Sequence, residues 1–366
     1  MEALLPYLRE AFANPASAHF AGRVAREAVE HGRAQVAASL GAQPSDVVFT
    51  SGATESVNLA LQGVARAPGP SRKVVTFAAE HKATLDTCEW LASQGTVVEV
   101  LPVGRDGVPD LDVAAQRIDE QTALVSVMAV NNETGVISPI RELVELARRV
   151  GALVHCDATQ ALGKLPFSVL ESGIDLVSVS SHKVYGPKGI GALIANRSSR
   201  LVLQPLIHGG GHERGLRSGT LNTPGIVGFG QACEIATSEL DDDVVRVRRL
   251  RDSLEAQLTD GIRGAHVIGG TTARVANTLN VRIPGHDAEA LLLEMGNIAA
   301  STGSACTAAS QAPSHVLRAM GLTYEESLEC IRFSLGRFST QDDVDAVATT
   351  LFWTLERERS SEAARG

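Results

Sequence analysis

The stretch that decides the fold covers residues 175–194 and is Asp175-Leu-Val-Ser-Val-Ser-Ser-His-Lys-Val-Tyr-Gly-Pro-Lys-Gly-Ile-Gly-Ala-Leu-Ile194. Its first part belongs to an apolar, β-branched run at 174–179, which predicts a buried strand. Ser180-Ser181-His182-Lys183 follow directly, ahead of a Gly/Pro turn. The stretch therefore predicts a core strand that brings polar side chains to one edge of a sheet.

Lys183 is the residue of this stretch with the most distinctive chemistry. A lysine at the end of a buried strand is expected to be poorly hydrated, which favours the neutral amine that forms a Schiff base with an aldehyde. Ser180 and His182 can donate hydrogen bonds to a phosphate. These side chains together predict a site for pyridoxal 5′-phosphate. The alternative is a surface lysine in a turn, which is the usual setting of a lysine.

Size and composition limit the class of protein. A chain of 366 residues with 44% hydrophobic and 20% charged residues predicts an ordinary globular protein with two domains. The formal net charge of −9 argues against a nucleic-acid-binding surface. The N-terminus does not resemble a secretory signal, and no apolar run approaches the roughly 20 residues of a membrane span. We therefore expect a cytoplasmic protein that binds neither membranes nor nucleic acid.

The five cysteines support this expectation. They form no C-x-x-C pair and are odd in number, so neither a disulfide framework nor a metal site is expected. Their dispersal is typical of a reducing compartment, where a single cysteine is either a packing residue or a nucleophile.

Strand-like runs alternate with helical stretches over the first two thirds of the chain. This alternation predicts an α/β fold with a mainly parallel sheet, whose ligands bind at the carboxyl ends of the strands. After residue 224 the pattern becomes mostly helical, which predicts a large domain at 1–238 and a smaller α+β domain at 239–366. The predicted strands are 47–50, 73–77, 96–101, 124–128, 152–156 and 175–179, with a further short one at 276–283.

Two of these strands lead into candidate binding segments. Phe49-Thr-Ser-Gly-Ala-Thr-Glu-Ser56 passes from a strand through a small-residue turn into a helix start, which is typical of an anion site. An ordinary helix capping box explains the same pattern. Asp157 ends another strand, where the protonated ring nitrogen of the cofactor would stabilise its buried carboxylate, and Gln160 could donate to the ring's phenolic oxygen. The alternative for Asp157 is a helix N-cap.

Other strand ends bring further polar residues to the same edge. His81 follows the 73–77 strand, where an imidazole could stack on a flat ring and exchange protons near neutral pH. Asn132 follows the 124–128 strand in the same way. For a lone histidine, a plain polar contact is the commoner role.

Two segments rich in small residues are predicted to lack regular structure. Residues 207–220 contain too many glycines for a helix, and we expect an extended connection able to reach a neighbouring subunit, or else a flexible linker. Residues 300–315 carry Cys306 among small residues, without strand or helix periodicity. An exposed thiol on such a loop suits a nucleophile that must deliver its sulfur elsewhere.

With these residues assembled, the chain resembles the NifS/IscS-type cysteine desulfurases, which are class V aminotransferases on the fold-type I pyridoxal-phosphate scaffold. The resemblance runs from about residue 5 to residue 345. It implies a seven-stranded, mainly parallel sheet flanked by helices, with a smaller α+β domain that carries the catalytic cysteine loop. The motifs behind it occur in order at residues 14–17 and 22–23, 50–56, 80–81, 131–135, 157–160, 181–189, 209–220, 306 and 331–337.

The resemblance implies a role for each candidate cofactor residue. Lys183 is similar to the Schiff-base lysine and His81 to the histidine that stacks on the ring. Asp157 is similar to the partner of the ring nitrogen, and Gln160 to the donor to the phenolic oxygen. The implied phosphate site comprises five residues, the last of which reaches across from the second subunit of a homodimer: Ala53, Thr54, Ser180, His182 and Thr220.

The resemblance also implies the reaction. Asn132 and Arg332 resemble the groups that hold the substrate carboxylate, and Cys306 the thiol that accepts sulfur as a persulfide. The implied activity is conversion of L-cysteine to L-alanine, with the sulfur passed to an acceptor protein for iron–sulfur cluster assembly or another thiolation pathway. Three alternatives stay open at this point: a selenocysteine lyase, a class V aminotransferase or β-lyase, and an inactive sulfur-carrier homologue.

Overall fold

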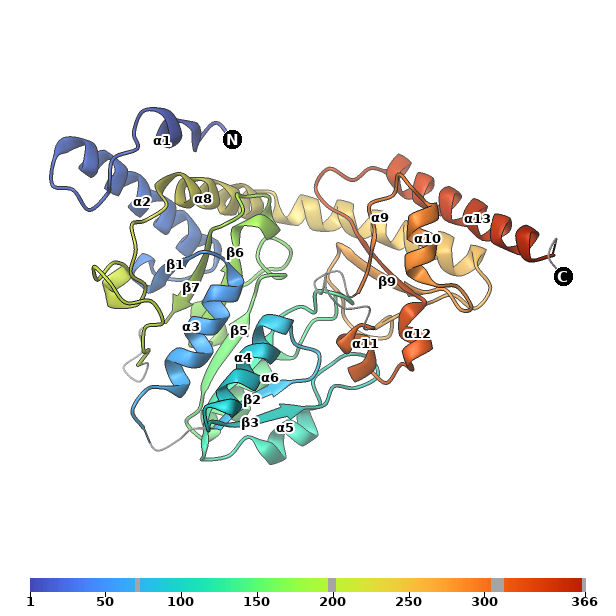
Figure 1. Ribbon diagram of the computed structural model, residues 1–366, viewed down its shortest axis with the longest axis horizontal. Coiled ribbons are helices and arrows are strands. Elements are labelled where there is room, and N and C mark those ends of the chain that lie inside the picture. Colours follow the sequence, from blue (N-terminus) through green and yellow to red (C-terminus); the bar gives the residue numbers. More distant parts are fainter. Residues whose placement is uncertain (70–72, 197–201, 304–312, 364–366) are drawn as a thin grey trace. The chain divides into compact units, whose positions relative to one another are not determined.

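The computed structural model describes residues 1–69, 73–196, 202–303 and 313–363. These residues form two compact units (Figure 1). The first unit contains Met1–Leu101, Pro109–Val130 and Ser138–Leu240, and the second contains Pro102–Val108, Asn131–Ile137 and the described part of Asp241–Gly366. Two short segments from the first half of the chain therefore belong to the second unit.

A seven-stranded sheet forms the centre of the first unit, in the order β1-β7-β6-β5-β4-β2-β3. Neighbours from β6 to β3 pair in parallel, and β7 is antiparallel to both β1 and β6. This arrangement confirms the predicted mainly parallel seven-stranded sheet. The strands are β1 (Val47–Thr50), β2 (Lys73–Phe77), β3 (Val97–Leu101), β4 (Thr122–Met128), β5 (Leu153–Asp157), β6 (Leu176–Ser180) and β7 (Gly191–Ala195).

Helices and short turns complete the first unit. Helices α3 and α4 pack against each other over the sheet, while α2 packs on α8 (Figure 1). Apolar side chains such as Leu61 and Leu91 fill the layer between α3, α4 and the strands. The helices are α1 (Leu5–Arg9), α2 (Phe20–Ser39), α3 (Ala53–Ala65), α4 (Lys82–Ser93), α5 (Leu111–Arg117), α6 (Ile140–Arg149), α7 (Val169–Ser172) and α8 (Thr223–Ser238), with 3-10 turns at Pro44–Asp46, Ser181–Val184 and Glu213–Gly215.

Strand β7 was not among the strands predicted from the residues, and its glycine explains why. Gly191 pairs with Thr50 on one side and Ser180 on the other. A Cβ atom at Gly191 would lie 2.7 Å from the Cα atom of Gly52, which is closer than packed atoms approach. The strand therefore needs a residue that strand propensity disfavours, because the start of α3 approaches β7 at this point.

The core of the sheet contains one fully buried imidazole. His155 on β5 has no exposed surface, and its Nδ1 and Nε2 atoms each lie 2.8 Å from a serine hydroxyl, of Ser126 and Ser178 respectively. Burial lowers the pKa of His155 to about 3. His155 is therefore neutral in the folded protein at any pH near neutrality.

This burial predicts a measurable pH dependence of stability. An unfolded histidine titrates near pH 6.5, so between pH 6.5 and 3 the unfolded chain binds one more proton than the folded chain. The folded chain is therefore destabilised as the pH falls through this window. From pH 6.5 to pH 5 we expect His155 to account for a loss of about 1.6 kcal/mol in the free energy of unfolding. Urea unfolding of wild type and His155→Gln at both pH values tests this. A variant that loses as much stability as wild type over that interval would contradict it.

The second unit is an antiparallel sheet covered by helices. Its strands lie in the order β10-β11-β9-β8, and its core includes Leu254, Leu279 and Ile331. Ile137 and Val275 tie the segment Asn131–Ile137 to this unit through backbone hydrogen bonds. Its elements are α9 (Leu240–Gly261), β8 (His266–Val267), β9 (Thr278–Arg282), α10 (Ala288–Glu294), β10 (Ser301–Thr302), α11 (His315–Ala319), α12 (Tyr324–Leu328), β11 (Cys330–Ser334) and α13 (Gln341–Ala363).

Hydropathy along the helices bears on membrane insertion. Over the described ranges, each helix is either too short or too polar to cross a bilayer.

Candidate active site

Asp157 is the last residue of β5 and pairs with Ser178 on β6. The side chain is buried, and its Oδ1 atom accepts a hydrogen bond of 2.9 Å from the Thr159 backbone N–H. This contact closes a turn and not a helix, because no helix begins in the described residues between β5 and α7, so the N-cap alternative for Asp157 is not met. Among the described residues the other oxygen has no hydrogen-bond partner, so it is the atom that could receive a ligand's N–H.

Glu80 is a second buried carboxyl at the same edge, and the sequence analysis gave it no role. Its Oε1 atom accepts a 2.8 Å hydrogen bond from the backbone N–H of Met128, the residue paired with Asp157 on the neighbouring strand. Burial raises the pKa of Glu80 well above its usual range, and the nearby charge of Asp157 adds to this rise. Glu80 is therefore expected to be protonated, which leaves the negative charge of the pair on Asp157. Its position directly before His81 was the available signal.

The predicted phosphate residues lie where β6 ends and α3 begins. The Ser180 hydroxyl is buried and lies 2.9 Å from Nδ1 of His182. Gly52 is the N-cap of α3 and offers no side-chain cap, so the first N–H groups of the helix, including those of Ala53 and Thr54, are not satisfied within the helix. Ser181 adds a buried hydroxyl that lacks a partner among the described residues. Backbone N–H groups and hydroxyls are the donors that an anion site uses, and the anion site itself stays a prediction.

Lys183 lies in the 3-10 turn Ser181–Val184, which carries its side chain beyond the buried end of β6. It is exposed, so the expectation of a poorly hydrated Lys183 is wrong. The half-buried lysine of this region is Lys164, which the sequence analysis missed. Burial and the charge of Lys183 lower the pKa of Lys164 to about 7. Its setting depends on tertiary packing, which no local pattern reveals.

Positive charge accumulates around this turn. Partial burial and the charge of Lys183 lower the pKa of His182, and Lys188 and Lys164 act in the same direction. Within the part of the chain that the structure describes, lysine ion pairs are made only by Lys73 and Lys82. The cluster thus lacks neutralising carboxylates, which suits a site for an anionic ligand.

His81 and Gln160 also lie at this edge. His81 is the N-cap of α4, with its Nδ1 atom accepting from the Ala83 backbone N–H at 3.0 Å. The polar-contact role considered for this histidine is therefore present, and it leaves Nε2 as the protonated nitrogen. Gln160 is half-buried and accepts a 2.6 Å hydrogen bond from Lys164.

The glycine-rich segment 207–220 is anchored rather than free. Glu213 is buried and forms two hydrogen bonds with the guanidinium of Arg33, of 2.8 and 2.9 Å. The same carboxylate accepts a 2.8 Å bond from the Phe49 backbone N–H. Arg217 binds Glu55, in the first turn of α3, at 2.8 Å. These contacts argue against the flexible-linker alternative, and Thr220 is exposed at the end of the segment.

In the second unit, Arg332 on β11 donates to the backbone carbonyl of Asn132 at 3.1 Å and to the Ser301 hydroxyl at 2.8 Å. Its buried Nε atom and the Asn132 Oδ1 atom have no hydrogen-bond partner among the described residues. Arg332 also has no carboxylate partner in the described ranges. The structure thus brings the two predicted substrate residues together, and the guanidinium suits an external carboxylate.

Cys306 lies outside the described residues, but one buried carboxylate lies close to both sides of 304–312. The Ser314 hydroxyl donates to Oε2 of Glu133 and accepts from the Leu317 N–H, capping α11. The same Oε2 atom lies against Gly303, where a Cβ atom would be 2.1 Å from it. Glu133 therefore contacts both Gly303 and Ser314, which its place in the Asn131-Asn132-Glu133 motif did not suggest.

The remaining cysteines are free, buried thiols. Burial raises the pKa of Cys88, Cys233 and Cys330 to about 12, and that of Cys156 well above its usual range. None of the four is a thiolate near neutral pH, which agrees with packing roles.

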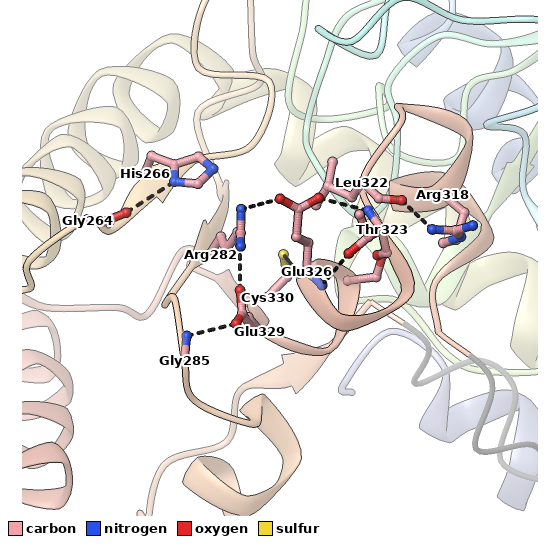
Figure 2. Close-up of polar contacts among 11 residues, drawn as sticks. Gly264, His266, Arg282, Gly285, Arg318, Leu322, Thr323, Glu326, Glu329 and Cys330 are labelled. Carbon is pink, nitrogen blue, oxygen red and sulfur yellow. Dashed lines mark hydrogen bonds and ion pairs between the residues drawn. The ribbon is translucent and has the colours of Figure 1, made fainter. Parts of the chain in front are cut away.

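The second unit also has a hollow of about 720 Å³ that contains none of the predicted site residues. Figure 2 shows Arg282 at its wall, bound to Glu326 at 2.8 Å and to Glu329 at 2.6 Å, with His266 nearby. The hydrogen bonds of Arg282 join β9 to α12 and to the residue that precedes β11, so we assign them to the packing of this unit.

Comparison with known proteins identifies the family. The aminotransferase class-V model matches residues 1–347. A protein of Rickettsia bellii named cysteine desulfurase IscS is 45% identical over 347 residues, which cover 94% of this chain and 85% of the relative. The chain therefore belongs to the aminotransferase class-V family, and its sequence resemblance to the cysteine desulfurases is confirmed.

Solved structures agree with this assignment. A NifS-like protein matches with a TM-score of 0.90 and 38% identity over 97% of this chain and 94% of the other. SspA, solved in complex with cysteine, matches with a TM-score of 0.82 and 36% identity over 93% of this chain and 95% of the other. The first unit's sheet is thus the fold-type I sheet that the resemblance implied.

Proposed function

We propose that this protein is a cysteine desulfurase that uses pyridoxal 5′-phosphate to convert L-cysteine to L-alanine and passes the sulfur to an acceptor protein. The observation that carries the proposal is the group of basic side chains around Lys183, which makes no ion pair with a carboxylate among the described residues. The turn that holds Lys183 follows β6, the strand that pairs with the Asp157 end of β5. Family membership and the relatives named cysteine desulfurase support the choice of substrate.

The described residues fit this cofactor. Its phosphate matches the unsatisfied N–H groups at the start of α3, the hydroxyl of Ser180 and the imidazole of His182. A protonated ring nitrogen matches the free oxygen of Asp157, and the aldehyde matches the amine of Lys183. When bound, the cofactor supplies a ring that withdraws electrons from the substrate amine attached to it.

Each side chain then has a definite task. Asp157 holds a proton on the ring nitrogen, and the protonated Glu80 leaves the negative charge on Asp157. Gln160 donates to the ring oxygen through its amide N–H. His81 would stack on the ring, and because its Nδ1 atom caps α4, Nε2 would be the atom that moves a proton.

The substrate residues belong to the second unit. Arg332 binds the carboxylate of cysteine through its guanidinium, with Asn132 beside it. The Cys306 thiolate attacks the cysteine sulfur, so that an S–S bond forms at Cys306, the carbon–sulfur bond of the substrate breaks, and its β-carbon gains a proton. L-Cysteine and one thiol thus give L-alanine and one persulfide, with no external oxidant or reductant.

We further infer a homodimer in which Thr220 of each subunit contributes to the phosphate site of the other. The exposure of Thr220 and the anchoring of its segment by Glu213 support this arrangement. The two units correspond in our proposal to a large cofactor domain and a small domain bearing the Cys306 loop. A reducing, cytoplasmic location is consistent with the free thiols of the four described cysteines.

Alanine release from cysteine tests the proposal directly. We expect wild-type protein to release about one alanine per subunit without a thiol acceptor and to turn over repeatedly when dithiothreitol is present. An aminotransferase would require a keto acid, and an inactive sulfur carrier would release none. A much higher kcat/KM for selenocysteine than for cysteine would instead favour the selenocysteine lyase.

Replacing Arg332 tests the substrate site. Lysine keeps the charge but cannot present two parallel N–H donors, so Arg332→Lys should not behave conservatively. We expect kcat/KM for cysteine to fall by about 2 kcal/mol in transition-state terms, roughly thirtyfold. Steady-state alanine assays measure this. Arg318→Lys, an arginine elsewhere in the same unit, is the matched control and should leave KM near its wild-type value.

A further inference from the structure

Lys164 has a fixed place next to the proposed cofactor site. The chain turns tightly after β5, with backbone hydrogen bonds of 2.9 Å from Ala161 to Ala158 and from Lys164 to Ala161. Gly163 allows this turn, because its φ is +67° and a Cβ atom would lie 2.8 Å from Ala236 on α8. The backbone of Lys164 is thus held rigidly, and its half-buried side chain extends back to Gln160.

The contact with Lys164 determines which end of the Gln160 amide is free. The Nζ atom of Lys164 donates to Oε1 of Gln160 at 2.6 Å. A lysine ammonium has three donors and no acceptor, so the reverse orientation of the amide would set N–H groups against N–H groups. The side chain of Gln160 therefore keeps its Nε2 donors for another partner. An oxygen that carries negative charge, such as the ring oxygen of the proposed cofactor, is a suitable acceptor.

Lys164 belongs to a group of basic side chains that also contains Lys183, His182 and Lys188. Burial and the charge of Lys183 lower the pKa of Lys164 to about 7.

We propose that Lys164 is a positioning residue of the cofactor site, which orients the Gln160 amide as a donor. This inference rests on the proposed function. It adds to that function a residue that touches neither substrate nor cofactor and acts through Gln160, which does.

Labelling of the wild-type protein gives a first test that needs neither activity nor cofactor. Burial and the charge of Lys183 predict that Lys164 reacts with acetic anhydride half-maximally near pH 7. Mass spectrometry of the full-length protein, labelled briefly across a pH series, measures this. A midpoint near the ordinary lysine value of about 10.4 would overturn the placement of Lys164 against Gln160 in this half-buried site. Because this result does not depend on the reaction, it separates failure of the inference from failure of the proposed function.

Absorption spectroscopy of the cofactor-loaded protein gives the second test. Lys164→Met should move the cofactor absorption maximum in the same direction as Gln160→Ala, because both variants lose the oriented amide donor. Lys164→Arg retains the donors and should keep the wild-type maximum. Lys188→Met, which removes a charge from the same group without touching Gln160, should leave the maximum unmoved. An unchanged maximum in Lys164→Met, or an equal change in Lys188→Met, would overturn the positioning role.

Discussion

Cys306→Ser should release alanine at least about 10³-fold more slowly than wild type. Other enzymes lose rate on this scale when their nucleophile is removed. A hydroxyl is not ionised near neutral pH and does not accept sulfur. A thiolate is ionised and does accept sulfur. Binding of cysteine should survive, because it depends on Lys183, Asn132 and Arg332. The variant should therefore still change the cofactor absorption when cysteine is added, while an alanine assay stays near background.

The matched control is a cysteine that the structure excludes as a nucleophile. Cys88 is buried and its pKa is raised to about 12, so Cys88→Ala should release alanine normally even if its stability falls. Wild-type protein incubated with cysteine and no reductant should gain one sulfur atom, on the peptide that contains Cys306. Sulfur found on Cys88 or Cys330 instead, or near-normal alanine from Cys306→Ser, would refute the persulfide step.

The elements that could be predicted from sequence are those with a strong local signal. Strands β2 and β6 are buried along their whole length. Their β-branched runs therefore predicted the bounds of both strands to within one residue. Strand β7 begins at Gly191 and was missed, because the close approach of Gly52 that requires this glycine is a tertiary feature. Strand β11 was read only as the motif around Arg332, because Cys330-Ile-Arg-Phe-Ser334 has a single β-branched residue and so lacks the run that marks β2 and β6.

The site divides in a similar way. Asp157 and Ser180 each end a strand, which a reader of the sequence can see. Glu80, Glu133 and Lys164 were missed because each derives its role from a contact made in the fold. Glu80 is neutralised by burial beside Asp157, and Glu133 touches residues 170 and 181 positions further along the chain. No spacing rule connects such residues, so they had to be found in the structure.

Lys183→Ala should abolish covalent attachment of the cofactor and reduce alanine release by about 10²- to 10⁴-fold, the range typical of losing a positioned proton-transfer group. The side chain lies in the turn after β6, among basic groups without carboxylate partners, so nothing in the described chain neutralises or blocks its amine. We expect the variant to keep some cofactor through the phosphate donors of α3 and Ser180, and dialysis should remove it. The absorption spectrum before and after dialysis, compared with wild type, measures this.

Borohydride reduction makes the bond between the lysine and the cofactor permanent, and so identifies the lysine directly. Peptide mapping of the reduced wild-type protein should place the label on Lys183. Lys164 is the informative competitor, because burial and the charge of Lys183 lower its pKa to about 7, so a neutral amine is present at Lys164 near pH 7. Its hydrogen bond to Gln160 holds it back from that reaction, while the exposed Lys183 is free to react. A label on Lys164 would mean that the lower pKa outweighs the geometry, and the assignment of the two lysines would have to be exchanged.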